Sequence, residues 1–223
     1  MIKHPSMNRS EFIKGLSAAG ALLAAGCSDD GDNADRTENK EKKAMTFNEL
    51  IEARRSVRRY AKSTISQGEM ETIVTEALNA PSWKNTETTR YYAAIGEATR
   101  ERIRKEALPG FNAASSENSA ALVAVTFVPG QSGFTNGSPS DELGNMWGAY
   151  DCGLASSYFI LAAKNHGWDS LIMGIRDVAK IKATLGIPEN EILLSVIAVG
   201  KSAQKYIKVP RKPVGEVLKT FKQ

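Results

Sequence analysis

The sequence predicts an α+β fold, and three observations support that class. Long helical patterns are separated by a few strand candidates that follow no regular βαβ alternation. Two of those candidates, residues 122–128 and 192–199, are nearly continuous apolar runs, which indicates buried strands. No Gly-x-Gly-x-x-Gly follows a strand and no Walker loop is present, so dinucleotide-binding and nucleotidase folds are disfavoured.

The composition predicts one folded domain, or one domain and a tail. The chain has 223 residues, of which 42% are hydrophobic and 24% are charged, so it can bury one sizeable core. The formal net charge is +4, and residues 1–26, with three basic residues and one acidic residue, contribute +2 of it. No Lys/Arg block typical of nucleic-acid binding occurs, so no nucleic-acid partner is expected.

The cysteines and histidines predict neither a disulfide nor a metal site. Cys27 ends an apolar N-terminal run, whereas Cys152 lies within a helical pattern, and these contexts argue against pairing. His4 and His166 lie in no Cys/His cluster, so no transition-metal site is expected.

Residues 1–26 have the pattern of a signal peptide of the lipoprotein type. A basic start precedes an apolar, small-residue run over 15–26, shorter than the roughly 20 residues that span a bilayer as a helix. Its end, Leu23 to Cys27, resembles the lipobox of bacterial lipoproteins, although Ala24 stands where that motif usually has leucine. The resemblance implies lipidation at Cys27 and an exported protein anchored at the periplasmic or cell-surface side. A soluble helix, or an ordinary cleaved signal with an incidental cysteine, remains an alternative.

Two further segments follow the predicted signal. Residues 27–45 are rich in Asp, Glu, Lys and Asn and have almost nothing to bury, so they are expected to form a disordered tether. Residues 46–223 are expected to form the folded domain.

The first part of that domain predicts two capped helices, a strand and a third helix. Thr46 can cap a helix whose apolar positions are Phe47, Leu50, Ile51 and Ala53. Ser66 to Glu69 has capping-box spacing and opens a helix whose apolar face is Met70, Ile73, Val74, Ala77 and Leu78. A strand at 91–95 and a helix at 98–107 are expected next.

The second part predicts a mobile loop at 129–141 between the strand 122–128 and a long helix. The stripe on that helix is expected to be core or subunit interface, and it comprises Met146, Trp147, Tyr150, Leu154, Tyr158 and Leu161. The remaining expected elements are a strand at 171–173, a helix at 178–185 ended by Gly186, the strand 192–199 and a helix at 214–221.

Four short strings carry candidate chemistry. The first has four arginines within six positions, at 54, 55, 58 and 59, together with Ser56. Guanidinium groups bind phosphate through paired, charge-assisted hydrogen bonds, so this string is a candidate phosphate site. A solvated basic face is the alternative.

The other three strings are a turn, a strand end and a C-terminal basic spot. The turn 80–86 carries Asn85, whose amide offers the donor and acceptor that an imide edge requires. Met173-Gly174 lies at a strand end, where glycine allows close backbone approach to a ligand. Arg211 lies between two prolines near the C-terminus.

In this order and spacing the four strings resemble the FMN-dependent nitroreductase family, over roughly residues 46–217. The resemblance implies a nitroreductase-like fold, with a central mixed or antiparallel sheet flanked by helices, in a domain-swapped homodimer. It also implies FMN as cofactor and NAD(P)H as co-substrate.

The resemblance implies binding roles for the basic residues. Arg54, Arg55 and Ser56 are expected near the FMN phosphate or ribityl chain, and Arg58 near the pyrimidine edge. Arg211 matches a C-terminal arginine at the phosphate.

The turn and the strand end also match the family. Pro81, Ser82 and Asn85 match a turn that implies Asn85 at the flavin imide, in a site at the subunit interface. Met173 and Gly174 match the loop whose backbone N–H faces flavin N5.

Asp151-x-Gly153 matches a family pattern in the long helix, and three other places depart from the family. Residues 86–89 read Thr-Glu-Thr-Thr where the family commonly has Ser-Gln-Pro-Trp. Met173 stands at a position that is acidic in some members, and Val209 replaces the first arginine of an Arg-x-Arg pattern. These departures leave the substrate class and the nicotinamide preference open.

The implied reaction is ping-pong. NAD(P)H would reduce FMN, and a nitroarene, quinone or similar electron-poor acceptor would then take the electrons at the same face, with no obligatory side-chain acid or base. Two alternatives are a lipoprotein that binds a phosphate-bearing ligand without turnover and a related flavoenzyme with another task, such as reductive dehalogenation. The expected partners are a second copy of the chain, the small-molecule acceptor and, through the lipid anchor only, a membrane.

Overall fold

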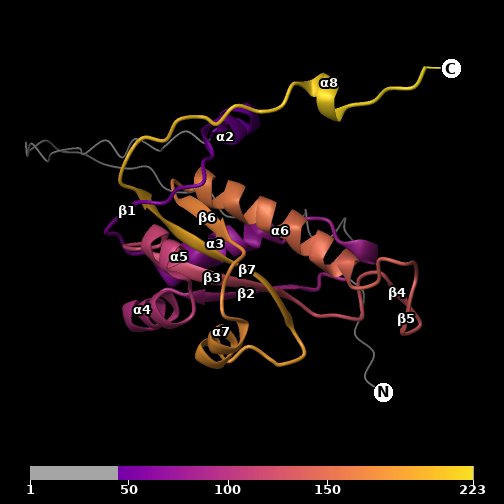
Figure 1. The fold of residues 1–223 in the computed structure, drawn as a ribbon, viewed down its shortest axis with the longest axis horizontal. Helices are drawn as coiled ribbons and strands as arrows, with labels where there is room; N and C mark the ends of the chain where they lie inside the picture. Colours follow the sequence, from indigo (N-terminus) through magenta and orange to yellow (C-terminus); the bar gives the residue numbers. More distant parts are fainter. Residues whose placement is uncertain (1–44, 223) are drawn as a thin grey trace, which may run out of the picture. The chain divides into compact units, whose positions relative to one another are not determined.

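A five-stranded sheet organises residues 45–222, the part of the chain that this computed structural model describes (Figure 1). Residues 1–44 and 223 lie outside the description, and with them the predicted signal peptide, Cys27 and the predicted tether up to residue 44. Within residues 45–222, no helix has both the length and the apolar character that crossing a bilayer requires.

The helices and strands follow the irregular order expected of an α+β fold. The helices are α2 (Phe47–Ala53), α3 (Gln67–Ala77), the 3₁₀ turn η2 (Trp83–Asn85), α4 (Glu97–Glu106), α5 (Gly110–Ser115), α6 (Met146–Asn165), α7 (Val178–Leu185) and α8 (Val214–Val217). The strands are β1 (Tyr60–Ala61), β2 (Thr89–Ala94), β3 (Ala121–Phe127), β4 (Phe134–Thr135), β5 (Ser138–Pro139), β6 (Asp169–Met173) and β7 (Ile192–Ser202).

Strand β7 is the hub of the main sheet. It pairs antiparallel with β1, β3 and β6, and β3 pairs antiparallel with β2. An isolated parallel bridge joins Ser56 to Ser170. The predicted α+β class and the helix-flanked sheet are confirmed.

Helices cover both faces of the sheet, which explains why its central strands read as continuous apolar runs. Successive residues of a strand point to opposite faces. Val123 and Ile197 belong to a core with residues of α3 and α6, whereas Leu122 and Val196 belong to a core with residues of α4 and α7. All seven residues of β3 are buried.

Helix α6 packs mostly small residues, together with Phe159, against the sheet. Its buried residues are Gly148, Asp151, Cys152, Ala155, Ser156, Phe159, Ala162 and Ala163. A Cβ at Gly148 would lie 2.5 Å from the Phe127 ring, so only glycine permits this approach. Cys152 is a free thiol, and burial raises its pKa to about 12.

The aromatic stripe on α6 is therefore not core. Met146, Tyr150 and Tyr158 are 58%, 60% and 42% exposed, so the core alternative is wrong for them. The reason is that these residues lie on the helix face opposite the small ones. The interface alternative stays a prediction.

Other differences from the predicted elements come from short or weakly packed segments. The helix expected at 214–221 is only the four-residue α8, because none of its residues is buried and isolated helical turns are unstable. The loop at 129–141 contains the β4–β5 hairpin, whose turn uses Asn136 and Gly137 at positive φ. Helix α5 was not predicted.

Candidate functional site

The basic segment that follows α2 is extended and attached to the sheet by its backbone. Arg54 leaves the helix with φ −63° and ψ 129°. The amide of Val57 donates to the carbonyl of Ser170 at 3.0 Å. Val57 is buried, while Ser56 and Arg58 are exposed, so the alternation of extended backbone turns these two predicted site residues outward.

Arg54 carries a guanidinium group near other cations and partly shielded from water. Burial is the main cause that lowers its pKa, and the positive charges of Arg211 and Arg55 lower it further. Neither the Arg54 nor the Arg211 side chain has a hydrogen-bond partner or carboxylate partner within residues 45–222. The fold thus brings together two predicted phosphate ligands from opposite ends of the domain, and an anion between them would relieve their repulsion.

Arg55 and Arg58 turn their guanidinium groups towards local carbonyls. Arg55 Nη1 donates to the carbonyls of Glu52 at 2.6 Å and of Arg54 at 2.8 Å, and its Nε is buried without a partner within the described residues. Arg58 Nη1 lies 3.4 Å from the Ser56 carbonyl. Arg58 also lines a hollow of about 670 Å³ with Arg59, Tyr60, Ala114, Ser115, Glu117, Asn118 and Ala203.

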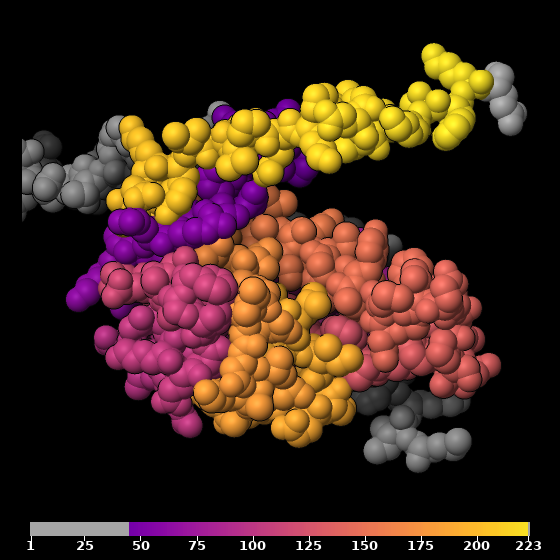
Figure 2. All heavy atoms as spheres, viewed as in Figure 1, coloured from indigo at the N-terminus to yellow at the C-terminus, as the bar shows by residue number. Residues whose placement is uncertain are grey.

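The C-terminal segment runs alongside the basic segment and α2 (Figures 1 and 2). The Arg58 amide donates to Tyr206 Oη at 2.8 Å, and Lys208 Nζ forms an ion pair with Glu52. These contacts place Arg211 near Arg54. Tyr206 and Lys208 were missed as positioning residues, because no local pattern marks a contact between two distant segments.

The turn that carries Pro81, Ser82 and Asn85 is held by a buried carboxylate of α6. Asp151 Oδ2 accepts a hydrogen bond from the Trp83 amide at 3.0 Å and another from the Ser132 hydroxyl at 2.7 Å. Ser82 Oγ accepts the Glu87 amide at 3.0 Å. Asp151 therefore has a structural role in this chain, whereas a Cβ at Gly153 would meet nothing within 4 Å.

Asn85 is exposed and lies at the outer end of the turn. Its backbone has φ 56°, in the left-handed region that asparagine tolerates better than most residues. Its Nδ2 donates to Glu87 Oε1 at 2.7 Å. Ser82 and Trp83 are partly buried beside it, and the Trp83 ring packs against the Trp147 ring in a tilted arrangement, with centroids 4.7 Å apart and planes at 49°.

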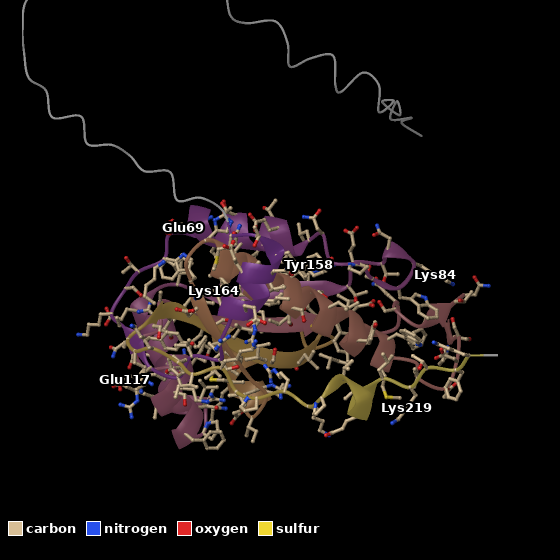
Figure 3. All side chains as sticks on the ribbon, turned by 90° about the horizontal axis from the view of Figure 1, so that it is seen from above. Glu69, Lys84, Glu117, Tyr158, Lys164 and Lys219 are labelled. Atoms are coloured by element: carbon tan, nitrogen blue, oxygen red, sulfur yellow. The ribbon has the colours of Figure 1, made fainter. Side chains whose placement is uncertain are left out.

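A single chain keeps the Asn85 turn apart from the arginines. The turn is attached near the start of α6 through Asp151, whereas Ser56 is attached to the strand that follows the end of α6. From Asp151 to Asn165 the helix rises roughly 21 Å, at about 1.5 Å per residue. Figure 1 shows α2 near the end of α6 that leads into β6, and Figure 3 shows Lys84 of the turn at one end of the domain.

The predicted strand-end pair lies at the start of an exposed loop. Met173 is buried as the last residue of β6, and Gly174 is exposed. The N–H groups of Gly174 and Ile175 have no partner among the described residues. Two side chains that the sequence did not indicate, Asn112 and Arg176, bond the carbonyls of this loop instead.

This donor set fits a phosphate-bearing flavin. It offers two neighbouring guanidinium groups for the phosphate and backbone N–H groups for acceptor atoms of a ring system, all without partners among residues 45–222. Within residues 45–222 no group of three or more His, Cys, Asp or Glu side chains could hold a metal ion.

Comparison with known proteins connects this arrangement with a family. The model of the nitroreductase family matches residues 51–201. A relative from Archaeoglobus fulgidus, provisionally named an NADH dehydrogenase/NAD(P)H nitroreductase, is 30% identical over 68% of this chain and 82% of its own length. A second relative, from Bacillus subtilis, carries the provisional name NAD(P)H nitroreductase YdgI and is 26% identical over 78% of this chain and 97% of its own.

A solved structure shares the fold. It comes from Exiguobacterium sibiricum and is described as a provisional nitroreductase in complex with FMN. Its TM-score is 0.68 and its sequence identity 24%, over 79% of this chain and 98% of that one.

The buried carboxylate of Asp151 generates the first prediction. Asp151→Ala should lower the free energy of unfolding by about 2–3 kcal/mol, because it leaves two donors without their acceptor. Asp151→Asn should cost less, since both donors use one oxygen and the amide retains one. Urea unfolding followed by tryptophan fluorescence measures both, and equal losses for the two variants would contradict the assigned role.

Proposed function

The chain belongs to the nitroreductase family, and on this premise we propose that it transfers electrons from NAD(P)H to nitroaromatic, quinone or similar electron-poor acceptors. Its cofactor is FMN. The names of two relatives support NAD(P)H-dependent nitroreductase activity, and the description of the E. sibiricum protein supports FMN. The observation that carries the proposal is the pair of guanidinium groups of Arg54 and Arg211, on the same domain as the N–H groups of the Gly174 loop, all without partners in the described part of the chain.

The chain's own residues would bind and orient the cofactor. Arg54 and Arg211 would hold its phosphate with charge-assisted hydrogen bonds, and Ser56 would add a hydroxyl donor. When bound, FMN supplies the chemistry of accepting and passing on a hydride equivalent. The backbone N–H groups of the Gly174 loop would stabilise negative charge on the ring, as preformed donors do at charge-developing sites.

A ping-pong order suits this geometry. The Gly174 loop is exposed, so one open face can receive the nicotinamide first and the acceptor after its departure. No proton-transferring side chain is assigned, because the binding set consists of guanidinium, hydroxyl, amide and backbone groups.

We also propose that the working form is a homodimer. In one chain the Asn85 turn and the arginines lie at opposite ends of the domain, so a complete site needs Asn85 from a second copy. The exposed residues Met146, Tyr150 and Tyr158 of α6 would lie in the interface. The C-terminal segment exposes further apolar residues that a second copy would cover, namely Ile207, Val209, Val214, Val217, Leu218 and Phe221.

Export is a separate proposal that rests on the sequence alone. We propose that Cys27 is lipidated and that the protein is anchored to a membrane on its periplasmic or cell-surface side. Two hydrophobic chains on one cysteine would suffice for stable attachment.

Flavin binding and turnover generate the second prediction. The purified chain, refolded with FMN, should be yellow and should oxidise NADH or NADPH with a nitroarene or a quinone. Arg54→Ala should weaken FMN binding roughly tenfold or more, because a charge-assisted hydrogen bond contributes about 1.5–3 kcal/mol. Fluorescence titration with FMN measures the loss of affinity.

Arg102→Ala is the matched control, since Arg102 is an exposed arginine of α4 that pairs only with Glu106 among the described residues. FMN affinity equal in the Arg54 and Arg102 variants would remove Arg54 from the site. A colourless wild-type protein that oxidises neither nucleotide would leave the non-catalytic alternative, whereas yellow protein active only on halogenated aromatics would favour reductive dehalogenation.

Sharing of the site between subunits generates the third prediction. Arg54→Ala and Asn85→Ala dimers should each be weakly active, because every site has one defect. After subunit exchange, mixed dimers would have one intact site and one with both defects, so activity should rise to about a quarter of the wild-type value for random reassortment. No gain on mixing, with exchange verified by mass spectrometry, would show that both residues serve the same chain's site.

Lipidation generates the fourth prediction. Mass spectrometry of the membrane-fraction protein should find a mature N-terminus at Cys27 with attached acyl chains. A Cys27→Ser variant should leave the membrane fraction. An unmodified Cys27 in the wild-type protein would refute the anchor without affecting the flavin proposal.

A further inference from the structure

Two side chains outside the family's motifs hold the loop that follows β6. Asn112 of α5 donates through Nδ2 to the carbonyl of Ile175 at 2.8 Å. The Arg176 guanidinium donates to the carbonyl of Gly174 and also to the carbonyl of Leu193 on β7. Asn112 is 8% exposed and Arg176 is partly buried, so both donors are held by the protein rather than by solvent.

The planar peptide links these bonds to the direction of the neighbouring N–H groups. In a trans peptide the C=O and N–H bonds point in opposite directions. A Gly174 carbonyl turned towards Arg176 therefore directs the Ile175 N–H the other way. In the same manner, an Ile175 carbonyl turned towards Asn112 directs the Arg176 N–H away from α5.

These two N–H groups are free to bind a ligand. Neither has a partner among the described residues. Ile175 is 65% exposed, so it lies in the accessible part of the loop. Two successive unpaired amides next to the Gly174 position form a donor pair of the kind that binds acceptor atoms.

The backbone alone would not fix this orientation. Gly174 lacks a Cβ and so has wide conformational freedom. β6 anchors one end of the loop, and the Asp177 amide anchors the other by donating to the Ala107 carbonyl at 2.7 Å. The two peptides between these anchors are held by side chains only.

We propose that Asn112 and Arg176 are positioning residues that keep the N–H groups of residues 175 and 176 aimed outward as a preformed donor pair for the FMN ring. The inference rests on the proposed function. Donors that are fixed in advance stabilise developing negative charge without reorganisation. Without the hydrogen bond from Asn112 or Arg176, the peptide group could rotate and point its carbonyl oxygen outward. The partial negative charge of that oxygen would then repel the negative charge on the ring.

The midpoint potential of bound FMN tests the proposal. Asn112→Ala and Arg176→Met should each lower the affinity for reduced FMN relative to oxidised FMN about tenfold, which is ~30 mV towards more negative potential for a two-electron couple. The affinity for oxidised FMN should change little. Arg176→Lys, which keeps the charge but cannot fork between two carbonyls, should shift the potential in the same direction by a smaller amount.

Arg104→Met is the matched control, because Arg104 is a partly buried arginine whose guanidinium binds Glu101 on the same helix. It should lower thermal stability without moving the potential. If Arg176→Met does not fold, Asn112→Ala and Arg176→Lys still decide the outcome.

The results separate the two proposals. Wild-type protein that binds FMN, with the potential unchanged in the Asn112 and Arg176 variants, would overturn the positioning role and leave the proposed function intact. Potentials that shift equally in Arg104→Met would also overturn it, because the effect would then be general destabilisation. Wild-type protein that binds no FMN would overturn both.

Discussion

The register of β7 against its three neighbours is the constraint on which the rest of the structure depends. Val196 and Ile197 face opposite cores, and a shift of one residue would exchange the two faces. The same register sets the position of β6, and thereby of Ser170, which holds the basic segment. It also places the Leu193 carbonyl where Arg176 reaches it. Both halves of the candidate flavin site thus take their positions from one strand.

A second constraint is electrostatic. The fold holds Arg54 near Arg55 and Arg211, although like charges in a partly desolvated position repel. Contacts elsewhere offset this repulsion, notably the hydrogen bond to Tyr206 and the ion pair of Lys208 with Glu52. A bound phosphate would offset the remaining repulsion between these guanidinium groups.

Local signals in the sequence were sufficient to predict several helices and strands. Thr46 caps its helix as predicted and Ser66 forms the predicted capping box, because the partners lie only three residues away. β3 and β7 were recognisable because burial on both faces leaves no polar alternation. The buried face of α6 was not recognisable from the sequence, because apolar residues surround that helix. Only tertiary packing decides which of them face the sheet.

Local sequence signals were also insufficient to predict how the candidate site is assembled. Arg54 and Arg211 could be named from the sequence, but their proximity depends on the path of the whole chain. Asn112 and Arg176 act on backbone carbonyls, and any residue type offers a carbonyl, so no pattern of side chains marks such contacts.

The closeness of Arg54 to Arg211 of the C-terminal segment has a consequence for biosynthesis. Arg54 is translated among the first residues of the domain and Arg211 among the last, with the entire sheet between them. The central strand β7 ends at Ser202, so the last strand of the sheet is synthesised shortly before Arg211. Cofactor binding that needs both arginines therefore follows completion of the sheet, and a chain that stops just before Tyr206 would keep all strands of the sheet but lack one of the two phosphate ligands.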